Sequence, residues 1–130
     1  MLGKNLRKLP KIELHLHLDC CLSFDVVKKI NPKIDIEAYN KKFKAPSTCS
    51  SVKEYIKCAE YAVDLMQDEK SISSVVEDLF DQLKAENIIY VEIRFAPLLH
   101  CKGELSSKEV VQIVDDIAKK INYTLNMKLF

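Results

Sequence analysis

Two short segments that alternate apolar and polar residues, with helix-like sequence between them, constrain the fold of this chain most strongly. The first segment is Lys11–Leu18 (KIELHLHL) and the second is Ile88–Phe95 (IIYVEIRF). Alternation is the period of a β-strand, because successive side chains point to opposite faces. Both segments are therefore predicted to be strands, and a third strand is predicted to begin at Asn126–Phe130.

The sequence between the predicted strands has helical periodicity. Apolar residues recur at three- and four-residue spacing in Val52–Met66, Ser71–Glu86 and Ser106–Ile121. Ser23–Ile30 is predicted to be a short helix, and Asn31–Ser50 is predicted to be a loop with a short turn or two. The order strand, helices, strand, helix, strand predicts an α/β protein with parallel strands.

Composition excludes several classes of protein. The 130 residues include 20 Lys and Arg against 19 Asp and Glu, which argues against a nucleic-acid-binding surface or a polybasic membrane patch. No apolar run approaches the roughly 18–20 residues that span a bilayer. The 5 cysteines are odd in number and lack a CxxC pair, and the start of the sequence does not look like a signal peptide. We therefore expect reduced thiols and a cytoplasmic location.

The first predicted strand places polar side chains on one face and apolar side chains on the other. The polar residues are Glu13, His15, His17 and, if the strand continues, Asp19. Histidines two residues apart on a strand have Cα atoms roughly 6.5–7 Å apart and parallel side chains. They can converge on one metal ion at about 2.0–2.1 Å per bond. The alternative is a pair of partly exposed histidines on an edge strand, but the neighbouring acids and the apolar opposite face favour a metal site.

Two stretches of the sequence resemble known strands of one family. Leu9–Asp19 (LPKIELHLHLD) resembles the opening strand of the adenosine deaminase family, in the metal-dependent amidohydrolase superfamily, and Tyr90–His100 (YVEIRFAPLLH) resembles its second strand. The resemblance covers nearly the whole chain and implies a TIM-type (β/α)₈ barrel. Because such barrels need about 250 residues, residues 1–130 are expected to be the N-terminal portion of the barrel domain, with the C-terminal part missing. That portion is the first two βα units and the start of a third strand.

The resemblance also implies a metal and substrate site. The family's two strand histidines bind a catalytic Zn²⁺, which makes His15 and His17 the expected zinc ligands. The aspartate two residues later contacts the ribose, so His17 and Asp19 are expected to bind the substrate. The helical segment after the first strand forms a hydrophobic lid in the family, and Tyr55 and Ile56 are the residues here expected to face the substrate.

The implied reaction is the hydrolytic deamination of adenosine or deoxyadenosine to inosine and ammonia in purine salvage. The family's acid and its remaining metal ligands lie further along the chain than these residues reach. We therefore expect no catalytic residue within this sequence and no activity from the chain alone. The expected partners are a small purine nucleoside and the missing remainder of the barrel, and no nucleic acid or membrane. The alternative is a non-catalytic truncated remnant or a partner-binding fragment.

Two cysteines, two charged strand residues and one further histidine also need an interpretation. Cys20 stands where the family usually has Gly, and a role for Cys20 or Cys21 as a metal ligand or redox switch is the functional alternative to a tolerated substitution. Glu92 and Arg94 share one predicted strand face, where we expect a structural ion-pair network with Glu13 as a partner of Arg94. The histidine at the end of the second matching stretch, His100, is expected to lie on the surface near the mouth of the barrel.

Overall fold

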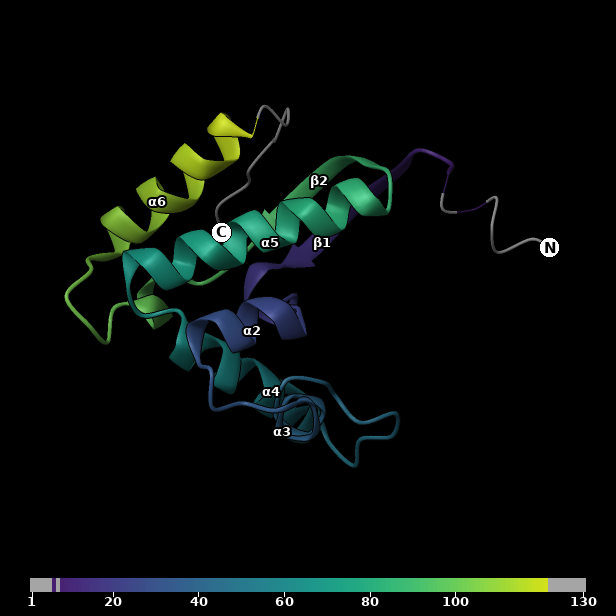
Figure 1. The fold of residues 1–130 in the computed structure, drawn as a ribbon, viewed down its shortest axis with the longest axis vertical. Helices are drawn as coiled ribbons and strands as arrows, with labels where there is room; N and C mark the ends of the chain where they lie inside the picture. The colour runs from purple at the N-terminus through teal and green to yellow at the C-terminus, as the bar shows by residue number, and fades with distance from the viewer. Residues whose placement is uncertain (1–5, 7, 122–130) are drawn as a thin grey trace.

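The computed structural model describes Leu6 and residues 8–121. In chain order the elements are β1 (Lys11–His17), η1 (Leu18–Cys20), α2 (Phe24–Ile30), α3 (Ile36–Lys42), α4 (Val52–Leu65), α5 (Glu69–Ala85), β2 (Ile88–Arg94), η2 (Pro97–His100) and α6 (Ser107–Lys120). In Figure 1, α5 runs along the two strands with α6 beside it, whereas α2, α3 and α4 gather at one end of the molecule. The mixed α/β order agrees with the prediction from sequence.

The two strands pair in parallel, with a register that is irregular in two places. Between the pairs Lys11–Ile88 and Ile12–Tyr90, β2 has one extra residue. Between the pairs Glu13–Val91 and Leu16–Ile93, three steps on β1 match two steps on β2, so β1 has one extra residue there. Such an insertion is a β-bulge, which changes the face to which the following side chains point. The regular alternation predicted for β1 is therefore wrong: Glu13 lies on the face opposite His17.

One face of this sheet is covered by α5. The helix buries its apolar side, which consists of Ile72, Val75, Val76, Leu79, Phe80 and Leu83. Val91 and Ile93 of β2 are buried in the same hydrophobic cluster, at 0% and 1% exposure. Burial of each such aliphatic side chain stabilises the fold by about 1.5–3 kcal/mol, so this face holds the core.

The other face of the sheet is open among the described residues. Ile12, Leu14 and Ile89 are 59%, 52% and 59% exposed. Large apolar side chains on a strand are normally covered when the strand is parallel. The sheet described here contains β1 and β2, and the third strand predicted at Asn126–Phe130 lies outside the described residues.

The predicted helices are present, but one of them begins earlier than predicted and an additional short helix lies inside the predicted loop. α5 begins at Glu69, earlier than predicted, because the Asp68 side chain caps it by accepting the Ser71 N–H at 2.9 Å. The short helix α3 lies inside the predicted loop, capped by Asp35, which accepts the Ala38 N–H at 2.8 Å. Across the part of the chain that the structure describes, no helix has both the length and the apolar character to cross a bilayer.

Candidate functional site

The candidate site lies where β1 and β2 end side by side. His17 and Arg94 are register partners at the carboxyl ends of the two strands. Each strand continues into a short 3₁₀ turn, η1 after β1 and η2 after β2. In α/β folds the carboxyl ends of parallel strands are where ligands bind, so side chains on these two turns and strand ends can reach one ligand.

His15 and His17 form a close pair at this end of β1. Their Nε2 atoms are 3.1 Å apart, and their rings are tilted by 38° with centroids 5.1 Å apart. Two nitrogens bound to one tetrahedral zinc at about 2.0–2.1 Å lie about 3.3 Å from each other. The predicted convergence of the two rings is present, and its geometry fits two of the four ligands of a zinc ion.

The pair supplies only part of a metal site within the described residues. Over Leu6 and residues 8–121, no three His, Cys, Asp or Glu side chains lie close enough together to hold a metal ion. Structural and catalytic zinc sites use three or four protein ligands. The two histidines therefore need ligands from elsewhere to complete the site.

Asp19 lies beside the histidine pair on η1. Its carboxyl oxygen Oδ1 is 3.9 Å from Nδ1 of His17, and the Asp19 side chain is only 10% exposed. That separation exceeds hydrogen-bond length but allows electrostatic attraction. A carboxylate near the outer nitrogen of a metal-binding histidine orients the ring and stabilises its Nδ1–H tautomer. The structure thus brings Asp19 and His17 together, as the sequence predicted.

The two cysteines that follow Asp19 have raised thiol pKa values in their local environment. Burial, followed by the neighbouring Asp19 carboxylate, raises the pKa of Cys20 to about 11. Burial, followed by the neighbouring Cys20, raises the pKa of Cys21 to about 12. Because the thiolate is the form that attacks electrophiles, these environments disfavour a redox role for either thiol.

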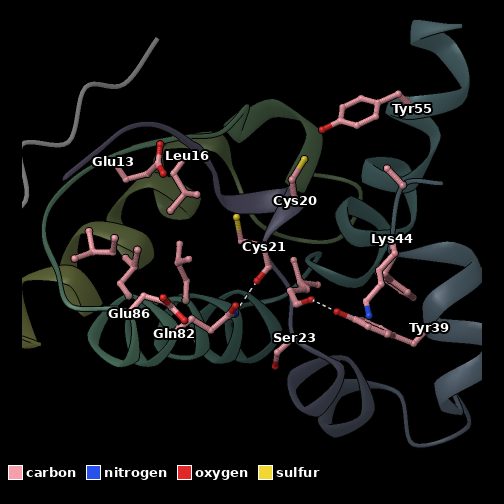
Figure 2. A pocket seen from close by; sticks show the side chains of 16 residues that line it. Glu13, Leu16, Cys20, Cys21, Ser23, Tyr39, Lys44, Tyr55, Gln82 and Glu86 are labelled. Carbon is pink, nitrogen blue, oxygen red and sulfur yellow. Dashed lines mark hydrogen bonds between the residues drawn. The ribbon is translucent and has the colours of Figure 1, made fainter. Parts of the chain in front are cut away.

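A cavity of about 680 Å³ lies between β1 and α5 (Figure 2). Glu13 and Leu16 line it from β1, and Cys20 and Cys21 line it from the following turn. Hydrogen bonds hold its wall together, since Gln82 Nε2 donates to the Cys21 carbonyl at 2.8 Å. Neither histidine of the pair lines this cavity, so it is separate from the predicted zinc site.

The two predicted lid residues occupy different environments. Tyr55 lines the far end of the cavity, on the side of Cys20 (Figure 2), and is 59% exposed. Ile56 does not line it and is 51% exposed. Among the described residues, therefore, Tyr55 approaches the turn that carries Asp19, whereas Ile56 faces solvent.

His100 differs from its predicted surface position. The side chain is 0% exposed, and its Nδ1 lies 3.0 Å from the Met66 carbonyl oxygen. Its Nε2 is buried without a hydrogen-bond partner among the described residues. Burial lowers the pKa of His100, so the neutral ring is favoured. No periodic signal in the sequence marks this burial, because η2 is an irregular turn packed beneath α4.

The hydrogen bonds of the charged residues on β2 differ from the ion-pair network predicted for Glu92 and Arg94. Tyr90 donates its hydroxyl to Glu92 at 3.0 Å, within the face that carries Arg94. In the strand register Glu13 lies opposite Val91, and Arg94 lies opposite His17. The bulge in β1 is the reason, because it reverses the faces of the residues before it relative to those after it.

Comparison with known families and proteins agrees with this arrangement. The family model described as adenosine deaminase matches residues 10–128. An adenosine deaminase from Clostridium perfringens is 38% identical over 117 residues, which cover 85% of this chain and 35% of the relative. The chain belongs to the adenosine deaminase family and spans about a third of the length of this relative.

Solved structures show the same fold at lower identity. An Arabidopsis ADAL protein complexed with IMP matches with a TM-score of 0.74 and 17% identity, over 97% of this chain and 42% of that one. Adenine deaminase from Arthrobacter aurescens matches with a TM-score of 0.72 and 17% identity, over 92% and 38%. An amidohydrolase from Burkholderia ambifaria with bound Zn matches with a TM-score of 0.65 and 15% identity, over 96% and 36%.

Proposed function

We propose that this chain supplies the zinc-binding first strand of an adenosine deaminase, which hydrolyses adenosine or deoxyadenosine to inosine and ammonia. The observation that carries the proposal is the 3.1 Å separation of the His15 and His17 Nε2 atoms where the parallel strands end. Membership of the adenosine deaminase family supports it. In this proposal residues 1–130 are the N-terminal portion of a (β/α)₈ barrel domain, comprising its first two βα units and the start of a third strand.

His15 and His17 would hold the zinc ion through their Nε2 atoms. Both rings must then be neutral and carry their proton on Nδ1. Asp19 lies on the Nδ1 side of His17, where its carboxylate favours that tautomer. Zinc bound here would supply Lewis acidity, which brings the pKa of a water molecule close to neutrality. The Burkholderia structure with bound Zn supports this choice of metal.

The substrate side of the proposal rests on three further residues. Asp19 accepts a hydrogen bond from a ribose hydroxyl, which favours a nucleoside over a free purine base. In this proposal Tyr55 and Ile56, which are 59% and 51% exposed among the described residues, would pack over a bound purine and limit the access of water to it. A nucleotide or a free base is the closest alternative substrate, since the solved structures with this fold include a protein complexed with IMP and an adenine deaminase.

We expect the chain to be inactive by itself. The pair supplies two of the ligands that a catalytic zinc needs, and the described residues hold no third. Loss of one electrostatic catalytic group alone typically costs ~10²–10³ in rate. The chain therefore requires the remainder of the barrel as its partner. The proposed location of the assembled enzyme is the cytoplasm. The competing function is a non-catalytic remnant or partner-binding fragment.

A chimeric enzyme tests the proposal directly. Residues 1–128 of this chain replace the matching N-terminal third of the Clostridium perfringens adenosine deaminase. We expect the chimera to turn over adenosine and to lose this activity in His15→Ala and in His17→Ala. The control is Gln112→Ala, at an exposed position on α6, which should keep the activity. A folded chimera that neither binds zinc nor deaminates adenosine would favour the non-catalytic function.

A further inference from the structure

The carboxyl-terminal end of α4 is fastened to the turn that follows β2. His100, at the end of η2, places its Nδ1 3.0 Å from the carbonyl oxygen of Met66, the residue that caps α4. The last carbonyl groups of a helix have no partner within the helix. The His100 N–H therefore satisfies one of them and ties η2 to the helix end.

Gln67 makes the second part of this connection. Its side-chain Nε2 donates to the Val63 carbonyl of α4 at 2.6 Å and to the Leu99 carbonyl of η2 at 3.0 Å. Its Oε1 accepts the Lys102 N–H at 2.9 Å. Gly103 lies so close that a Cβ atom there would be 2.8 Å from the Gln67 carbonyl oxygen. We call these contacts of His100 and Gln67 the clasp.

The two ends of α4 differ in how well they are packed. Ala62 and Met66, at the clasped end, are 3% and 0% exposed. Val52, Tyr55 and Ile56, in the first half, are 73%, 59% and 51% exposed. The buried end, the clasp and the packing of α4 against η1 thus hold the helix, while these apolar side chains of its first half are largely exposed.

We propose that His100 and Gln67 are positioning residues that set the direction of α4 and so the place of Tyr55. Tyr55 precedes Met66 by 11 residues, which is about 16 Å along a helix at 1.5 Å per residue. A tilt of about 10° at the clasp would move Tyr55 by about 3 Å. The part of this inference that concerns a purine rests on the proposed function, but the placement of α4 by the clasp does not.

Cys58 provides a native reporter of this placement. It lies one turn after Tyr55 on α4, and its thiol donates to the Lys44 carbonyl at 3.3 Å. A change in the direction of α4 breaks this contact and exposes the thiol. Cys49 lies outside the helix and is already exposed, so it is an internal reference for the labelling reaction.

The test compares matched substitutions in the 130-residue chain. His100→Leu and Gln67→Met keep the side-chain bulk but remove the donors, whereas His100→Asn keeps an N–H near the position of Nδ1. Alkylation of Cys58, read by peptide mass spectrometry, and hydrogen exchange over residues 52–58 are measured together. We expect both rates to rise about fivefold or more in His100→Leu and Gln67→Met, and to stay near wild type in His100→Asn. Gln112→Met, on the exposed side of α6, is the control for loss of a glutamine.

Two results would overturn the proposal. One is no change in Cys58 labelling or in exchange over residues 52–58 when the donors are removed. The other is an equal rise throughout α5 and α6, which would show that the clasp residues only support the core. Neither measurement needs zinc, a purine or turnover, so an inactive chimera and a failed clasp are distinguishable results.

Discussion

The two faces of the β1–β2 sheet show how unevenly this chain is packed. On the face covered by α5, Val91 and Ile93 are 0% and 1% exposed. On the open face, Ile12 and Leu14 are 59% and 52% exposed, and the histidine pair stands beside them. The covered face therefore carries the stability of the described part of the chain, and the open face carries the candidate chemistry without the cover that a strand in a barrel has.

The largest difference in stability is expected between two variants, each of which truncates one large side chain on one face of the sheet. Phe80 of α5 is 0% exposed, so Phe80→Ala should lower the free energy of unfolding by about 3–5 kcal/mol. Leu14→Ala, on the open face, should change it by no more than about 0.5 kcal/mol at protein concentrations low enough for the chain to be monomeric. Urea unfolding of both variants measures the difference. A large loss for Leu14→Ala would show that the open face is covered in solution.

Self-association of the chain also tests the difference between the covered and the open face of the sheet. An open sheet face and unpaired strand edges invite contacts with other chains. We expect the wild-type chain to sediment as concentration-dependent oligomers, and Leu14→Lys, which places a charge on the open face, to shift the distribution towards monomer. The exposed helix residue Glu77 lies away from this face, so Glu77→Lys is the charge control. A monodisperse wild-type monomer with a sharp cooperative unfolding transition would contradict the truncated-barrel interpretation.

The smallest expected effect is the pH dependence that His100 contributes. Burial holds the pKa of His100 below its ordinary value. The unfolded chain therefore binds a proton more readily, so stability falls as the pH drops from about 6.5 towards the lower pKa of the folded state and is unaffected above that range. His100→Asn should reduce the loss of stability between pH 7.5 and pH 5.5, measured by urea unfolding. An identical pH profile in the variant would show that His100 is not the responsible group.

The regular elements could be predicted from sequence because their signals are local. The alternation in Lys11–Leu18 and the periodicity of Ser106–Ile121 both report structure directly, and the Ser106–Glu109 capping box is present where α6 begins. α3 (Ile36–Lys42) differs from the prediction because Asn31–Ser50 is rich in Lys and Pro, a composition typical of a loop, and the Asp35 cap alone does not outweigh it. Local patterns thus define an element only where composition and periodicity agree.

The candidate site was predictable only in part. The approach of His15 to His17 follows from their spacing of two residues on one strand, so it could be predicted from the sequence alone. The bulge that reverses Glu13 depends on the register against β2, and the burial of His100 depends on α4 lying over η2. Both result from contacts between segments far apart in the chain, for which a single sequence carries no local signal.

A zinc titration of the 130-residue chain and its histidine variants tests most sharply whether His15 and His17 bind the metal. We expect weak binding, because the described residues supply two imidazole ligands and no third. We also expect His15→Ala and His17→Ala each to abolish this binding, whereas His100→Asn leaves it unchanged. Nanomolar zinc binding that survives His15→Ala would show that other residues hold the metal and that the assignment of this pair is wrong.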